Sequence, residues 1–117
     1  MLPFEKLDVY NKAVDYIDCI YDLIEGFPKE ERFGLIDQLR RASVSISTNI
    51  AEGSGRYHKK DFTQFLRMAR SSAYECVALL QVSLRRKYIT EKAYNDLYGR
   101  VAELTKMISG LVRSLGD

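Results

Sequence analysis

The chain has 117 residues and a formal net charge of +2, which suits one domain with a hydrophobic core and is too short for two. Its two cysteines stand alone in the sequence, so they form neither a CxxC motif nor a disulfide framework. No apolar run approaches the roughly 20 residues of a membrane span, and the acidic N-terminus differs from a signal peptide. We therefore expect a single cytoplasmic domain over residues 1–117 that has no membrane partner and keeps Cys19 and Cys76 as free thiols.

The charge is unevenly distributed along the chain. Residues 1–39 carry four Lys/Arg against nine Asp/Glu, and residues 88–117 carry four of each. Residues 40–87 carry ten Lys/Arg against three Asp/Glu, a net charge of +7 within a nearly neutral protein. This basic middle segment is the part of the chain best suited to an anionic partner.

The first predicted helix covers about residues 5–25. Its apolar side chains recur every three or four residues, and they are Leu7, Tyr10, Val14, Ile17, Tyr21 and Ile24. We expect this seam to face the core, because acidic residues occupy the opposite face. A second apolar set widens the arc to about 180°, whereas one bundle core needs about 100°; this set is Val9, Tyr16, Ile20 and Leu23. The excess indicates either a wide core or a subunit interface.

The stretch SVSISTNIAEGSGR, residues 43–56, fits two templates. Apolar and polar residues alternate as in a half-buried strand, yet Ser43, Ile46 and Ile50 also follow the helical spacing. No other segment resembles a strand, and a lone strand would leave its backbone groups without partners. We therefore predict a second helix over about residues 29–53, with those three side chains facing the core.

The small side chains of this second helix are expected to let a neighbouring helix approach closely, and they are Ala42, Ser43, Ser47 and Ala51. Small hydroxyls can also bond back to the carbonyl four residues earlier. Pro28 and the acids that follow it suit the start of the helix, and Gly53 and Gly55 are expected to end it.

Two further helices are predicted over about residues 59–87 and 90–115. The third buries, by the same spacing, Phe62, Phe65, Leu66, Ala69, Ala73, Cys76 and Leu80. The fourth follows Thr90, a plausible N-cap, and its seam is Tyr94, Leu97, Val101, Leu104, Ile108, Leu111 and Leu115. Four such helices joined by short turns predict an all-α, up-down-up-down antiparallel four-helix bundle.

A polar stripe on the second helix is the first candidate for function. Its members fall within about 80° of one another, and they are Gln38, Arg41, Ser45, Asn49, Glu52 and Arg56. The stripe is either a solvated face with a Glu52–Arg56 ion pair or a patch that lines an assembly interface or binds a ligand. On the third helix, Glu75 is expected level with Arg40 and is predicted to pair with Arg40 or Arg41.

Residues for catalysis or metal binding are scarce. His58 is the only histidine, so neither a histidine metal cluster nor a histidine-centred triad is supplied. Nothing near Glu75 completes an acid–base site, and Gly53 and Gly55 lack the GK[ST] of a phosphate loop. We predict no catalytic residue, no metal and no cofactor.

A basic face on the third helix is the second candidate for function. Five cations lie within about a 100° arc opposite the apolar seam, and they are Lys59, Lys60, Arg67, Arg70 and Arg85. Arg56 and His58 extend the face into the preceding turn. Such charges suffice for phosphate contacts in a nucleic acid, although an ordinary solvated face has the same composition.

Three segments resemble a bacterial family of four-helix bundles, the 23S rRNA-intervening sequence proteins: FEKLDVYNKA, QLRRASVSISTNIAEGSGR and FTQFLRMARSSAYE. The family motif falls on Asn49, Ile50, Ala51, Glu52, Gly53 and Arg56, with Glu75 at the acidic position of the third helix. Many relatives have proline where this chain has Ser47, so this helix is expected to be straighter.

The resemblance implies a cytoplasmic bundle that assembles as a ring, a homopentamer, with no established catalytic activity. It also implies a relation to the accessory variability determinant of diversity-generating retroelements, which works with a reverse transcriptase and nucleic acid.

Three hypotheses follow for the function. The first is a non-enzymatic, ring-forming bundle that binds nucleic acid, specifically structured RNA, through its basic face. The second is a structural oligomer that holds a protein partner, such as a reverse transcriptase, and has no nucleic-acid role. The third is an enzyme, which would require Glu75, Asn49 and Arg41 to converge in a closed pocket.

Overall fold

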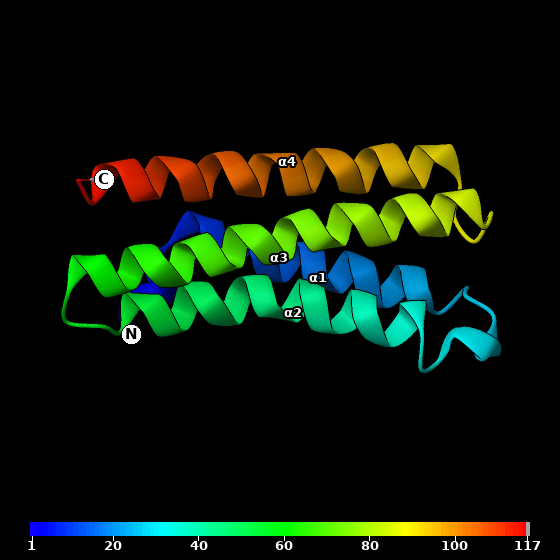
Figure 1. Ribbon diagram of the computed structural model, residues 1–117, viewed down its shortest axis with the longest axis horizontal. Coiled ribbons are helices and arrows are strands. Elements are labelled where there is room, and N and C mark those ends of the chain that lie inside the picture. Colours follow the sequence, from blue (N-terminus) through cyan, green and yellow to red (C-terminus); the bar gives the residue numbers. More distant parts are fainter. Residues whose placement is uncertain (117) are drawn as a thin grey trace.

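The computed structural model describes residues 1–116 and confirms the all-α four-helix bundle. In these residues the helices are α1 (Asp8–Ile24), α2 (Leu35–Ser54), α3 (Lys59–Arg85) and α4 (Glu91–Ser114), with the short 3-10 helices η1 (Pro3–Lys6) and η2 (Lys29–Glu31). Successive helices run up and down a rod about 43 Å long (Figure 1). Helix α2 packs between α1 and α3, and α4 closes the bundle against α3 and α1.

The stretch SVSISTNIAEGSGR is helical over residues 43–54, which decides between the two templates in favour of the helix. Ser43, Ile46 and Ile50 are fully buried, as predicted. Ser47 donates a hydrogen bond to the Val44 carbonyl, three residues back instead of four, at 2.9 Å. Packing of this buried face overrides the weak helix propensity of its β-branched and serine residues.

Helix α2 begins at Leu35, six residues later than predicted. Residues 29–31 form η2 instead, and the non-helical Gly34 (φ −110°, ψ −115°) precedes the first turn of α2. A side-chain oxygen of Glu31 accepts a hydrogen bond from the Leu35 N–H at 3.1 Å. The carboxylate therefore satisfies one of the free N–H groups at the helix start, where negative charge is also favourable.

Gly53 does not end α2, contrary to the sequence prediction. The helix continues to Ser54 and Gly55 is its C-cap, so only the second glycine stands at the boundary. Gly53 is buried against α3. A methyl group at this position would lie 2.7 Å from Cβ of Phe65 and 2.9 Å from the Phe62 ring. The role of Gly53 is thus to allow close approach of α2 and α3.

Helix α1 turns a different face to the core than predicted. Its buried residues are Val9, Ala13, Tyr16, Ile20 and Ile24. Apart from Ile24, the predicted seam lies beside this face and is only partly covered, with Leu7, Tyr10, Val14 and Ile17 half-buried and Tyr21 exposed. The set that the sequence marked as excess supplies most of the core, and the predicted seam borders the surface.

Helices α3 and α4 follow the predicted seams in their central turns, whereas Phe62 and Phe65 of α3 were predicted to be buried and are only half-buried. The end residues of the α4 seam, Tyr94, Leu111 and Leu115, are likewise half-buried. On α4, Leu97, Val101, Leu104 and Ile108 are buried. Thr90 caps α4 as predicted, because its hydroxyl accepts a hydrogen bond from the Ala93 N–H at 3.1 Å. Together with the α2 face, these seams form one continuous core along the rod.

Candidate nucleic-acid interface

Four of the predicted cations form a row along the first half of α3. Lys59, Lys60, Arg67 and Arg70 are all exposed. Arg85, the fifth, follows Arg70 by fifteen residues, which is roughly 22 Å along a helix, and it lies near the opposite end of the rod. The structure therefore separates Arg85 from the other four.

Helix α4 adds two cations that the sequence prediction did not include. Arg70, Lys106 and Arg113 line one shallow depression between α3 and α4. Lys59, Lys60 and Arg67 line a second one beside the end of α4. We call these six residues, from both helices, the basic face. It extends over about half the length of the rod, along the outer edge where α3 meets α4.

The α4 cations were missed because the last segment of the chain is neutral in total. The acids of α4 lie earlier in the helix, where Asp96 pairs with Arg100 at 3.4 Å and Glu103 pairs with Lys12 of α1 at 3.2 Å. Lys106 and Arg113 follow, seven residues apart on one helical face. The positions of these two cations around the helix axis show that they share a face of α4, whereas the net charge of the segment conceals them.

The turn residues Arg56 and His58 are exposed, beside the start of α3. The guanidinium of Arg56 lies 4.7 Å from the centre of the Phe65 ring, a cation–π contact. Within residues 1–116 Arg56 forms no ion pair with Glu52, so this part of the prediction is wrong. The aromatic face of α3 holds Arg56 instead.

The polar stripe of α2 splits into a packed middle and exposed ends. Ser45 is hydrogen-bonded to Ser72 of α3 at 2.9 Å, and Nδ2 of Asn49 donates to the Ser45 carbonyl at 2.8 Å and to its hydroxyl at 3.0 Å. Ser45 therefore belongs to the contact between α2 and α3, and Asn49 is hydrogen-bonded to it from within α2. Arg41 and Glu52, towards the two ends of the stripe, are exposed.

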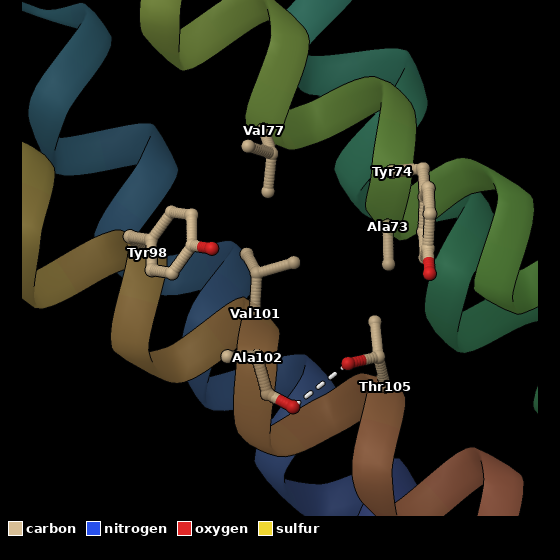
Figure 2. A pocket seen from close by; sticks show the side chains of 7 residues that line it. All are labelled: Ala73, Tyr74, Val77, Tyr98, Val101, Ala102 and Thr105. Atoms are coloured by element: carbon tan, nitrogen blue, oxygen red, sulfur yellow. Dashed lines mark hydrogen bonds between the residues drawn. The ribbon is translucent and has the colours of Figure 1, made fainter.

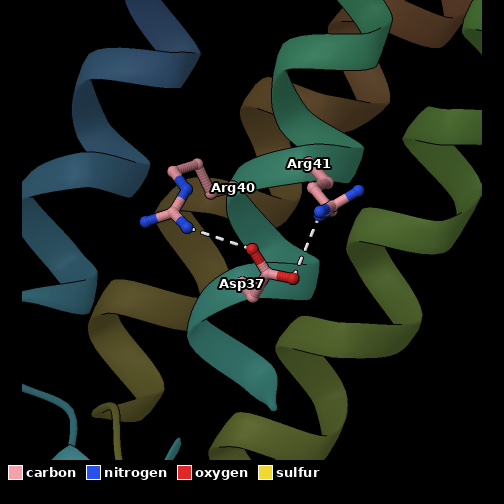
Figure 3. A network of polar contacts seen from close by, with 3 residues as sticks. All are labelled: Asp37, Arg40 and Arg41. Carbon is pink, nitrogen blue, oxygen red and sulfur yellow. Dashed lines mark hydrogen bonds and ion pairs between the residues drawn. The ribbon is translucent and has the colours of Figure 1, made fainter. Parts of the chain in front are cut away.

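Asp37 forms ion pairs with the two arginines that were predicted to pair with Glu75. Its two carboxylate oxygens accept hydrogen bonds from Arg40 and Arg41, each at 3.0 Å, and Figure 3 shows the arginines on opposite sides of Asp37. The predicted Glu75–Arg40 or Glu75–Arg41 pair is absent from the described residues. Ser45 faces Ser72, so Glu75 is level with Ala42, two residues from the predicted Arg40 and still close to the level of Arg41. The pair is absent because Asp37, on the same helix as the arginines, pairs with both of them.

A buried polar cluster in the core has the character of a structural contact. The Ser43 hydroxyl donates to the Tyr16 hydroxyl at 3.4 Å and lies 3.6 Å from Sγ of Cys76. Burial raises the pKa of Tyr16 and of Cys76, so both remain protonated at neutral pH. A reactive thiol needs exposure and a lowered pKa, and Cys76 has neither. Among residues 1–116 no group of His, Cys, Asp and Glu could hold a metal ion.

Comparison with known proteins identifies the family. The family model of the 23S rRNA-intervening sequence proteins matches residues 5–110. The chain belongs to this family. A 23S rRNA-intervening sequence protein therefore carries the basic face and the α2–α3 contact described above.

A solved structure supports the same assignment. A protein of unknown function from the S23 ribosomal protein family of Bacteroides thetaiotaomicron is 26% identical, with a TM-score of 0.82 over 89% of this chain and 97% of that chain. No curated protein matches the sequence. In the described part of this family member, none of the helices is both long enough and apolar enough to cross a membrane.

Proposed function

We propose that this protein is a non-enzymatic, ring-forming bundle that binds structured RNA in the cytoplasm through its basic face. The observation that carries the proposal is the gathering of six cations from α3 and α4 along one edge of the rod. The nearest acids of α4 pair with other cations, Asp96 with Arg100 and Glu103 with Lys12.

The chemistry required is modest. Lysine and arginine side chains neutralise backbone phosphates and release counterions, a contribution that needs no base contacts and weakens as salt rises. Lys59 and Lys60 also lie in the first turn of α3, where the helix dipole adds positive potential. This arrangement favours a polyanion over a small neutral substrate.

Reversing three charges at this edge should weaken RNA binding strongly. We expect the triple variant Lys59→Glu, Lys60→Glu and Arg113→Glu to lose at least about tenfold in affinity for a structured RNA in low salt. The dependence of affinity on salt should also become shallower, by about 0.9 in the log–log slope for each phosphate that the variant no longer neutralises. Fluorescence anisotropy over a salt series measures both quantities.

The matched control reverses three charges at the opposite end of the rod. The variant Arg85→Glu, Arg86→Glu and Lys87→Glu has the same net charge and should bind the RNA nearly as well as the parent protein. Equal reductions in affinity for the two triple variants would mean that only net charge matters. Absence of binding by the parent protein at low salt would overturn the RNA proposal.

A second candidate function, a structural oligomer that holds a protein partner, is favoured by α1. Tyr10, Val14, Ile17 and Tyr21 form a partly uncovered apolar stripe. Tyr21 also lines a depression that it shares with α2 residues, including Val44 of the same apolar character. Apolar surface beside the exposed arginines of α2 suits a contact between subunits, such as those of a pentameric ring.

The exposed end of the polar stripe gives a test of assembly. If the stripe faces a neighbouring subunit, Glu52→Lys should reduce the oligomer mass while leaving the helical content of the monomer intact. Size exclusion with light scattering, together with circular dichroism on the same sample, separates these effects. Asp15→Lys makes the same charge change on the outer face of α1 and is the control. An unchanged mass and melting temperature for Glu52→Lys would make this exposed end of the stripe a solvated surface only.

A further inference from the structure

A hollow between α3 and α4 adjoins the basic face. It has a volume of about 280 Å³, close to the lower end of the range of roughly 300–1,000 Å³ typical of small-ligand sites. Its apolar lining comes from both helices, with Ala73 and Val77 on α3 and Val101 and Ala102 on α4. Figure 2 shows Ala73, Val77 and Val101 directed into the space between the two helices.

Two tyrosines flank the hollow and leave their rings accessible. Tyr74 of α3 is 58% exposed and Tyr98 of α4 is 47% exposed, which is unusual for large aromatic side chains beside an apolar surface. They lie on opposite sides of the hollow in Figure 2. We call the hollow and its two flanking rings the tyrosine groove.

The tyrosine groove and the basic face share side chains. Arg70 donates a hydrogen bond to the Tyr74 hydroxyl at 2.9 Å, and its guanidinium carbon lies 5.0 Å from the centre of the Tyr74 ring. Arg70 also lines the depression that holds Lys106 and Arg113, and Thr105 lines both that depression and the groove. The tyrosine groove therefore opens directly onto the basic face.

Thr105 adds one polar atom to the groove. Its hydroxyl donates to the Ala102 carbonyl at 2.8 Å, so the hydroxyl oxygen remains able to accept a hydrogen bond from a ligand (Figure 2). The groove thus combines flat aromatic surface, apolar contact and one acceptor, beside positive charge. A planar base joined to phosphates has the complementary features.

We propose that the tyrosine groove binds an unpaired nucleobase of a single-stranded segment, stacked on Tyr74 or Tyr98, while the adjoining phosphates contact Arg70, Lys106 and Arg113. This inference rests on the proposed RNA-binding function and specifies the part of the RNA that is bound. A duplex cannot place a stacked base in the groove without opening, whereas a loop or a single strand can. Stacking of successive bases on aromatic side chains is the general means by which proteins hold single strands.

The experiment compares four probes of equal length by fluorescence anisotropy. They are a single-stranded RNA, the same sequence as DNA, the RNA in a duplex, and a backbone of abasic spacers. The parent protein should bind the two single strands more tightly than the abasic backbone, because only they supply bases. Binding of either the RNA or the DNA single strand supports the proposal if that binding depends on the tyrosines. The strand that binds more tightly identifies the preferred nucleic acid.

Variants in the groove give the decisive comparison. Removal of the ring that carries the base, by Tyr74→Ala or by Tyr98→Ala, should weaken single-strand binding by about fivefold to a hundredfold and leave abasic-backbone binding nearly unchanged. Tyr74→Phe keeps the ring and should retain most of the affinity. Phe33→Ala removes an aromatic side chain that is even more exposed, from the loop before α2, and should have no effect.

The failures of the two proposals are distinguishable. If the parent protein binds single strands but the alanine variants bind them equally well, the groove is not a base site and the basic face stands alone. If the alanine variants change the oligomer mass in light scattering, a second copy of the chain covers the groove and the inference is overturned. If the parent protein binds none of the probes at low salt, both the groove and the proposed function fall.

Discussion

Replacing Gly53 with alanine should lower the free energy of unfolding by about 1–3 kcal/mol, the usual cost of overpacking a core. The added methyl group would lie 2.7 Å from Cβ of Phe65, an atom fixed to the backbone of α3, so α2 and α3 must move apart. Alanine favours a helix interior over glycine by about 1 kcal/mol. The clash acts against this gain and should exceed it. Urea unfolding followed by circular dichroism measures the difference.

Gly99 provides the matched control for this substitution. It lies in the exposed part of α4, and a methyl group there would meet no atom within 4 Å. Gly99→Ala should therefore stabilise the protein by about 0.5–1 kcal/mol, through helix propensity alone. Effects of the same sign for the two variants would contradict the view that Gly53 is required for close helix packing.

Replacing Ser43 with leucine should have a comparable effect, at a cost of about 1–3 kcal/mol from overpacking. Ser43 is 0% exposed and touches Tyr16 of α1 and Cys76 of α3, so a larger side chain presses on both neighbours at once. The substitution also removes the hydrogen bond to the Tyr16 hydroxyl, which remains buried. The midpoint of urea unfolding gives the size of the change.

Two further variants separate packing from general hydrophobicity. Ser43→Ala removes the hydroxyl without adding volume and should cost only about 1 kcal/mol. Thr48→Leu places the same leucine on the exposed face of α2, where it should be nearly neutral. If the Ser43→Leu protein were as stable as the Thr48→Leu protein, close packing of the neighbouring helices would not require a small side chain at position 43.

The parts of the fold that the sequence predicted have one clear apolar face. The α4 seam and the helical state of residues 43–52 followed from periodicity and from the need to satisfy backbone groups. The buried face of α1 was harder to predict, because apolar residues cover about half the circumference of the helix. The predicted seam and the second apolar set both have the helical period. Only contact with α2 and α4 decides that Tyr16 lies inside and Tyr21 outside.

The remaining errors have local physical causes. The late start of α2 depends on the Glu31 side chain, which accepts a hydrogen bond from the Leu35 N–H. The periodicity of apolar residues gives no sign of such a contact. The missing Glu75 pair has a similar cause, because Asp37 lies three and four residues before the two arginines on α2 and pairs with both. Cations of α3 were found from sequence because they lie in one helix, whereas Lys106 and Arg113 join them only when α4 packs alongside α3.

The order of the helices around the rod also determines how the chain reaches its native state. Within residues 1–116 each of the four α-helices packs against the one that precedes it in sequence, and the contacts of α1 with α4 and of η1 with α2 join more distant parts of the chain. Such low contact order is the property that lets helical bundles fold within about microseconds to milliseconds. Helices α2 and α3 share the most extensive contact, so we expect the antiparallel pair joined by residues 55–58 to form early in folding. On this view the small side chains of α2 also serve folding speed, because they let this pair form without rearrangement of bulky groups.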